Sequence, residues 1–147
     1  DLFAGSGALG LEAVSRGAAR AVLVERDPAL AAMLRQHAAR LDAGDRIEVA
    51  NEDALRWLAR APAAKADIAF VDPPFAAGLW EAAMPALLPH LAADAWLYVE
   101  SPAGTAPAPP PGWRLHRELA TAQARAALYR GPGARGADTL GPANPAP

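Results

Sequence analysis

A glycine-rich segment between an apolar segment and a helical pattern places the strongest constraint on this chain. Residues 5–10 read Gly-Ser-Gly-Ala-Leu-Gly, which is the pattern G-x-G-x-x-G. Glycine is needed where a backbone turns sharply from a strand into a helix and where a ligand must come close to the main chain. The pattern predicts that residues 1–3 end a β-strand and that a helix runs over residues 8–16. A tight turn without a ligand would use the same residues, so the glycines alone are weak evidence for a binding site.

Apolar segments and helical patterns alternate along the rest of the chain. Short strands are predicted at residues 21–25, 47–51, 67–72 and 95–100, with helices at residues 28–41, 54–60 and 79–91 between them. Such alternation is typical of a parallel sheet covered by helices. Residues 113–119 and 125–130 are predicted to pair as a closing antiparallel hairpin. We therefore expect an α/β, Rossmann-like fold with a mostly parallel sheet whose first strand is truncated.

The length of the chain suits a single domain. Of its 147 residues, we expect residues 1–130 to form that domain. Asp1 falls inside the first motif, so we expect the domain to be incomplete at its N-terminus. Residues 131–147 contain four glycines and four prolines and little to bury, and we expect them to be disordered.

Composition excludes several classes of site. The chain has no cysteine, which excludes disulfides, thiolate zinc sites and a cysteine nucleophile. His37, His90 and His116 show no metal-ligand spacing, so no metal site is expected. The formal net charge of −2 does not by itself indicate a nucleic-acid-binding protein. No apolar run approaches the length of a membrane-spanning helix.

Four carboxylates follow the predicted strands and indicate the kind of cofactor. Glu25 lies 20 positions after Gly5, the spacing at which an acid reaches the ribose hydroxyls of a nucleoside. Asp1, Asp53 and Asp72 also lie at or just after the ends of predicted strands, and these ends line one crevice in an open parallel sheet. Carboxylates there would repel the pyrophosphate of NAD or FAD. They would attract the sulfonium and ammonium groups of S-adenosylmethionine, each by about 1–4 kcal/mol at ~4 Å. Asp53 would also serve as the N-cap of the helix that begins after it.

The segment Asp72-Pro73-Pro74-Phe75 directly follows the fourth predicted strand. Two successive prolines hold the backbone extended and remove two N–H donors, which leaves a carboxylate, free carbonyl groups and an aromatic ring. This combination suits a flat base with an exocyclic amine, because the oxygens accept its N–H groups and the ring stacks on the base. The alternative is a rigid turn with Phe75 packed in the core.

These motifs resemble the class I S-adenosylmethionine-dependent methyltransferases. The segment 72–75 matches the signature (D/N/S)-P-P-(Y/F/W) of the branch that methylates amino groups. Together with residues 1–13, 24–27 and 98–100, it is similar to the ribosomal RNA small subunit methyltransferase D family, which methylates N2 of a guanine in 16S rRNA. The resemblance extends over nearly the whole of residues 1–130.

The resemblance implies a role for each site residue. The methionine part of the cofactor would be held by Asp1, Gly5 and Gly7, the ribose by Glu25, the adenine by Asp53 and Ala54, and the guanine by Asp72, Pro73, Pro74 and Phe75, of which Asp72, Pro73 and Phe75 would be catalytic. The implied reaction is direct transfer of the methyl group to the amine, without a metal or a covalent enzyme intermediate. It would depend mainly on placing nitrogen, methyl carbon and sulfur in line.

The implied partner is 16S rRNA or the assembling small ribosomal subunit, and we expect a cytoplasmic monomer. The family carries a basic stretch before the first motif that helps to bind RNA. This chain begins after the position of that basic stretch, so we expect it to bind RNA weakly. DNA adenine-N6 and other amino-methyltransferases share both motifs. The glycine pattern alone also fits an NAD-dependent oxidoreductase or a non-catalytic nucleotide-binding module.

Overall fold

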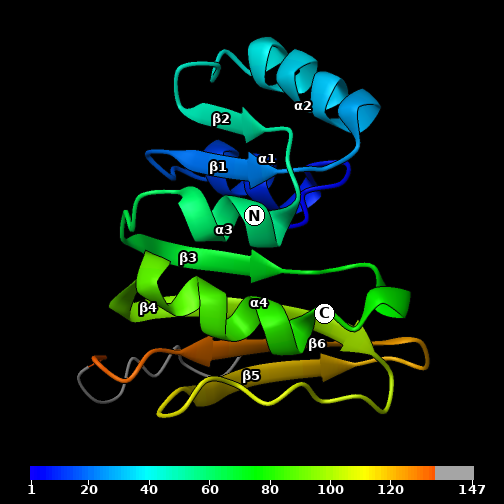
Figure 1. Cartoon of the computed structure of the whole chain (residues 1–147), viewed down its shortest axis with the longest axis vertical. Helices are drawn as coiled ribbons and strands as arrows, with labels where there is room; N and C mark the ends of the chain where they lie inside the picture. The colour runs from blue at the N-terminus through cyan, green and yellow to red at the C-terminus, as the bar shows by residue number, and fades with distance from the viewer. Residues whose placement is uncertain (135–147) are drawn as a thin grey trace, which may run out of the picture.

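The computed structural model describes residues 1–134 as a layered α/β fold (Figure 1). Its helices are α1 (Ala8–Ser15), α2 (Pro28–Arg40), α3 (Ala54–Arg60) and α4 (Trp80–Leu87), with short 3₁₀ helices η1 (Phe75–Ala77) and η2 (Leu88–His90). Its strands are β1 (Ala21–Val24), β2 (Ile47–Ala50), β3 (Ala66–Val71), β4 (Leu91–Pro102), β5 (Arg114–Ala120) and β6 (Ala124–Arg130). This order confirms the predicted Rossmann-like architecture with a closing hairpin.

The strands form two hydrogen-bonded sheets. β1 and β2 pair in parallel, and the second sheet has the order β3-β4-β6-β5. β3 and β4 are parallel, whereas β6 is antiparallel to both β4 and β5. Helices α3 and α4 lie on the viewer's side of the strands in Figure 1, and α1 lies behind β1. The sheet is therefore mostly parallel and ends in an antiparallel hairpin, as predicted.

Residues 1–4 connect the two sheets. The structure assigns them no strand, contrary to the prediction that residues 1–3 end one. Their backbone nevertheless bonds on both sides. Ala4 N donates to Val24 O at 2.9 Å, Val24 N donates to Asp1 O at 2.8 Å, and Leu2 N donates to Phe70 O at 3.2 Å. The segment thus occupies the position of a central strand between β1 and β3, and the turn at Gly5 begins before a longer ladder can form.

Buried and half-buried residues alternate along β4. The buried residues face α3 and α4, and the half-buried residues lie on the opposite face of the larger sheet. Ala95, Leu97 and Val99 are buried and belong to the apolar cluster that includes α3 and α4. The residues between and after them, Trp96, Tyr98 and Glu100, are half-buried. A second apolar cluster joins α1, α2, β1 and β2. The two clusters hold the carboxyl ends of β1 and β3 beside residues 1–4.

Two predicted segments differ in detail. The helix expected over residues 79–91 is shorter, because Pro85 lies inside α4 and Pro89 lies in the 3₁₀ turn η2 that follows. The predicted tail begins at Gly131, yet Gly131 N donates to Ala95 O at 2.9 Å and Gly133 N donates to Ala93 O at 2.8 Å. Residues 131–134 therefore continue alongside β4. The rest of the predicted tail, residues 135–147, lies outside the described residues.

The helices of residues 1–134 are all too short or too polar to cross a membrane.

Candidate functional site

A cavity of about 610 Å³ opens where β1, β2 and β3 end and α1 begins. Nine of the ten predicted site residues line it, namely Asp1, Gly5, Glu25, Asp53, Ala54, Asp72, Pro73, Pro74 and Phe75. The tenth, Gly7, does not line the cavity. The carboxyl ends of parallel strands meet at one edge of the fold, which explains why residues so far apart in the sequence converge here.

The glycine turn shapes one wall of the cavity. Gly5 and Gly7 adopt φ angles of 53° and 82°, a left-handed conformation that only glycine enters without strain. Gly5 lines the cavity, whereas a Cβ on Gly7 would lie 2.4 Å from Leu34 Cδ2 and 2.7 Å from Leu11 Cδ1. Gly7 therefore lets α1 pack closely against α2, and Gly5 brings the main chain to the cavity.

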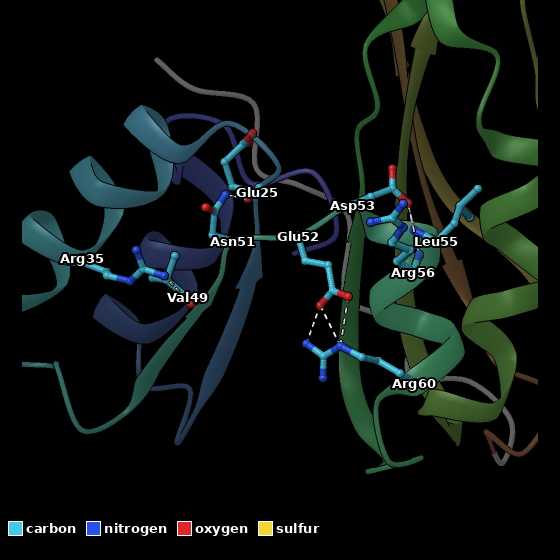
Figure 2. A network of polar contacts seen from close by, with 9 residues as sticks. All are labelled: Glu25, Arg35, Val49, Asn51, Glu52, Asp53, Leu55, Arg56 and Arg60. Carbon is cyan, nitrogen blue, oxygen red and sulfur yellow. Dashed lines mark hydrogen bonds and ion pairs between the residues drawn. The ribbon is translucent and has the colours of Figure 1, made fainter.

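The Glu25 carboxylate is held in place by the glycine turn. Its Oε2 accepts from Gly5 N at 2.8 Å and its Oε1 accepts from Asp27 N at 2.8 Å. Asn51 Nδ2 donates to the backbone oxygen of Glu25 at 2.8 Å (Figure 2). It also donates to the backbone oxygen of Arg26 at 3.0 Å. Each carboxylate oxygen has two lone pairs, so both oxygens can still accept a second donor from a ligand.

Asp53 acts as the N-cap of α3 and also lines the cavity. Its Oδ1 accepts from Leu55 N at 3.0 Å and from Arg56 N at 3.1 Å (Figure 2). The predicted N-cap is therefore confirmed, and Oδ2 is not used in the cap. The predicted contact of Asp53 with a cofactor stays a prediction. Beside it, Glu52 accepts two bonds from Arg60 Nε, at 2.9 and 2.8 Å, and this guanidinium lowers the pKa of Glu52.

Asp1 also lines the cavity. Its Oδ2 accepts from Gly10 N at 3.1 Å. Its Oδ1 is buried and has no hydrogen-bond partner among the residues that the structure describes. A buried carboxylate oxygen without a donor is costly, so this atom favours a ligand or a water molecule with N–H or O–H groups nearby.

Residues 72–75, the Asp-Pro-Pro-Phe segment that follows β3 and is called the Asp72 motif below, also line the cavity. Burial raises the pKa of the Asp72 carboxyl, and the nearby Glu100 carboxylate raises it further. Pro73 is fully buried, but Phe75 is 40% exposed and its ring lies 6.3 Å from the Trp80 ring. The alternative of a core Phe75 is therefore wrong, because the 3₁₀ turn η1 holds this ring at the surface beside the cavity.

The charge of the cavity is strongly negative. Six carboxylates and one guanidinium line it: Asp1, Glu25, Asp27, Glu52, Asp53 and Asp72, against Arg26. Such a wall favours a ligand with positive charge and hydroxyl or amino donors, and it disfavours a pyrophosphate. Within residues 1–134, no group of three or more His, Cys, Asp or Glu side chains is arranged to hold a metal ion.

Two polar residues beside Asp72 were not predicted as site residues. Tyr98 Oη donates to Glu100 Oε2 at 3.0 Å, and both residues lie on β4, next to the strand that carries Asp72. Their positions alternate with the apolar residues 97 and 99, which is the only sign in the sequence that they share a face. The register between β3 and β4, which the sequence does not reveal, brings this face to Asp72.

Comparisons with known proteins identify the family of this chain. A family model described as conserved hypothetical protein 95 matches residues 1–130. The chain is 44% identical over 133 residues to ribosomal RNA small subunit methyltransferase D of Escherichia coli, covering 88% of this chain and 66% of that protein. It is 34% identical over 135 residues to the Haemophilus influenzae protein of the same name, covering 88% of this chain and 69% of that one.

A solved structure is also similar to this chain. A putative methyltransferase from E. coli superposes with a TM-score of 0.82 and 44% identity, covering 89% of this chain and 73% of that one. The chain thus spans slightly less than two thirds of the E. coli relative named above and carries every motif on which the resemblance rests. The chain belongs to the conserved hypothetical protein 95 family, with the ribosomal RNA small subunit methyltransferase D proteins among its relatives.

Proposed function

We propose that this chain transfers a methyl group from S-adenosylmethionine to the exocyclic N2 amine of a guanine in 16S rRNA. The observation that carries the proposal is the Asp72 motif, which supplies a carboxylate and a half-exposed ring at the edge of an acidic cavity. The relatives named ribosomal RNA small subunit methyltransferase D support the reaction class and the rRNA substrate. The choice of guanine N2 follows from the resemblance of the motifs.

The residues around the cavity fit S-adenosylmethionine. Its ammonium and sulfonium groups match the acidic wall, and Asp1, whose Oδ1 has no hydrogen-bond partner among the described residues, lines the same cavity. Glu25, with capacity left on both carboxylate oxygens, would accept the two ribose hydroxyls. Asp53 Oδ2 would accept the adenine amine, with Ala54 beside it. When bound, the cofactor supplies an electrophilic methyl group on a positively charged sulfur.

The residues of the motif would orient the amine and receive its proton. The Asp72 carboxylate and the Pro73 carbonyl accept its N–H groups, which aims the nitrogen lone pair toward the cavity. The Phe75 ring, exposed on one side, stacks on the base. Transfer would form the new N–C bond and break the methyl–sulfur bond, which leaves a neutral thioether and an amine nitrogen with one proton too many. Asp72, whose pKa is already raised, is the nearest acceptor for that proton.

The experiment is a transfer assay with the full chain. Tritiated S-adenosylmethionine should label 16S rRNA from undermethylated small subunits, and nucleotide mapping should locate the label on a guanine. The assay is run on free rRNA and on subunits, which determines the form of the substrate. Label on an adenine would favour the DNA adenine-N6 type of activity. A melting temperature raised by NAD and not by S-adenosylmethionine would favour an oxidoreductase.

Glu25→Gln should weaken the binding of S-adenosylmethionine by about 10–100-fold. The change removes a negative charge, and it replaces one acceptor of the Gly5 and Asp27 amides with a donor, so charge-assisted bonds to the ribose are lost. Calorimetric titration gives the affinity. Glu48→Gln is the matched control, because Glu48 lies on β2 and pairs with Arg20 away from the cavity. An affinity reduced less than about threefold would contradict the role of Glu25.

The rate should fall in acid with an apparent pKa above that of an ordinary aspartate. Only the ionised Asp72 can take up the proton that the amine releases, and burial and Glu100 both raise its pKa, so activity is lost as the pH falls through this raised value. A profile of kcat/KM against pH from 4 to 10, which reports the pKa of the free enzyme, should therefore show an acidic limb that Glu100→Gln moves to lower pH. A limb that stays in place in this variant would contradict the coupling of the two carboxylates.

A further inference from the structure

Four side chains near the ends of β3 and β4 share one face of the sheet. In the parallel register, Phe70 pairs with Tyr98 and Val71 pairs with Val99. Val71 and Val99 are fully buried in the cluster that includes α3 and α4, so their neighbours in sequence lie on the opposite face. The rings of Phe70 and Tyr98 meet edge to face at 6.0 Å on that side. Glu100 is the next residue of β4 on that side, two positions beyond Tyr98, and Asp72 directly follows β3, two positions beyond Phe70. The two carboxylates are close enough for Glu100 to raise the pKa of Asp72.

Glu100 is fixed at two points. Its Oε2 accepts from Tyr98 Oη at 3.0 Å, and its backbone oxygen accepts from Trp80 Nε1 at 2.8 Å. Trp80 is buried and its ring also contacts Phe75, so the same indole joins Glu100 to the proposed stacking ring. Burial and the Glu100 carboxylate raise the pKa of Tyr98 to about 12, so its hydroxyl stays a donor at neutral pH.

One oxygen of this ordered carboxylate is free to bind a ligand. Oε1 of Glu100 accepts no hydrogen bond from residues 1–134, and Glu100 is only half-buried. Glu100 does not line the cavity proposed for the cofactor, whereas its neighbour Asp72 does. The two carboxylates therefore offer adjacent acceptors, with Asp72 next to the cofactor and Glu100 further from it.

Two adjacent acceptors match one nucleobase edge better than the others. Guanine presents two neighbouring donors, N1–H and the N2 amine. Adenine and cytosine present an amine next to a ring nitrogen that is itself an acceptor. We propose that Glu100 is a specificity-determining residue that accepts N1–H of the target guanine while Asp72 accepts its N2 amine, an inference that rests on the proposed function. An acceptor ring nitrogen opposite Glu100 would leave two lone pairs facing each other, so adenine and cytosine are rejected.

The nucleobase analogue 2-aminopurine separates this role from a purely structural one. It keeps the amine at position 2 but carries an unprotonated N1, which is an acceptor. The mapped target guanine is replaced by 2-aminopurine at that single position, in the free RNA or subunit that the transfer assay identifies as the substrate. The full chain should methylate the guanine substrate with a kcat/KM at least about 100-fold higher than the 2-aminopurine substrate.

Glu100→Gln should lower this ratio at least about tenfold, because the glutamine amide can donate to the unprotonated N1. Tyr98→Phe, which removes the donor that fixes Glu100 Oε2, should lower the ratio about threefold to tenfold. Asp94→Asn is the matched control, since Asp94 is exposed near the other end of β4, and its ratio should equal that of the unmodified chain. The affinity for S-adenosylmethionine is measured for each variant as a check on folding.

A ratio that stays unchanged in both Glu100→Gln and Tyr98→Phe would overturn the role of Glu100, even if both variants become slower. A chain that methylates no guanine substrate at all would instead overturn the proposed function, and the inference with it. The two failures are distinguishable, because only the second is visible in the unmodified chain.

Discussion

Asp72→Asn should lower kcat for methyl transfer by about 10²–10³-fold and leave the affinity for S-adenosylmethionine within about threefold. The amide loses the negative charge that stabilises the developing positive charge on the attacking nitrogen, and it cannot take up the released proton. The carboxylates proposed to hold the cofactor, Asp1, Glu25 and Asp53, are untouched. Single-turnover rates with saturating cofactor measure the effect on the chemical step, and calorimetric titration measures the binding.

The same substitution should not destabilise the fold. The folded-state pKa of Asp72 is raised above its ordinary value, so its ionised form is disfavoured by folding and stability falls as the pH rises through the shifted range. A neutral asparagine removes that cost at pH 7. Urea unfolding should therefore give equal or higher stability for Asp72→Asn. Asp67→Asn, in the exposed first part of β3, is the matched control and should change neither kcat nor stability appreciably. Equal rate losses in both variants would contradict the role of Asp72.

The sequence predicts most of the secondary structure because local signals specify it. Asp27 and Pro28 predict the start of α2, and the structure has Asp27 as the N-cap accepting from Ala29 N and Leu30 N. Gly17 has a φ of 108° just after α1, as expected for the residue that ends a helix. The errors arise where the interaction is between distant parts of the chain. The conformation of residues 1–4 depends on β1 and β3, and residues 131–134 are ordered by bonds to β4.

The sequence predicts only part of the candidate site, because the rest depends on contacts between distant parts of the chain. In an open parallel sheet, strand ends converge, so acids at those ends are expected to meet without knowledge of the strand order. Gly7 shows the limit of this argument. Its place in the motif suggests contact with the cofactor, but only the packing of α2 against α1 reveals that Leu34 occupies the space beside it. Glu100 was missed because its proximity to Asp72 depends on the register between β3 and β4.

The acidic cavity also constrains how an RNA could approach. Six carboxylates near one guanidinium would repel a phosphate that came as close as the base. Under the proposed function, the target guanine must therefore leave its stack and enter alone, while the backbone stays outside the cavity. Phe75 lines the cavity and is 40% exposed, so under the proposed function its ring would offer the base a stacking partner in exchange for the lost stacking.

Gly7→Ala should lower the free energy of unfolding by about 2–5 kcal/mol, as measured by urea unfolding. Two costs add at this position: about 1–2 kcal/mol for an L-residue at a φ of 82°, and about 1–3 kcal/mol for a Cβ placed 2.4 Å from Leu34 Cδ2 and 2.7 Å from Leu11 Cδ1. Leu34 is fully buried between the helices and β1, so it cannot move away freely.

Gly17→Ala separates these two costs. Gly17 also has a positive φ, of 108°, but a Cβ there meets nothing within 4 Å. The substitution therefore strains only the backbone and should lower the free energy of unfolding by about 1–2 kcal/mol. The difference between the two losses of unfolding free energy then measures how tightly the glycine turn is packed against α2. Because the turn also fixes Gly5 and, through it, the Glu25 carboxylate, a clear difference means that the cofactor wall is supported by the core. Equal losses in the two variants would mean that Gly7 is required only for its backbone conformation.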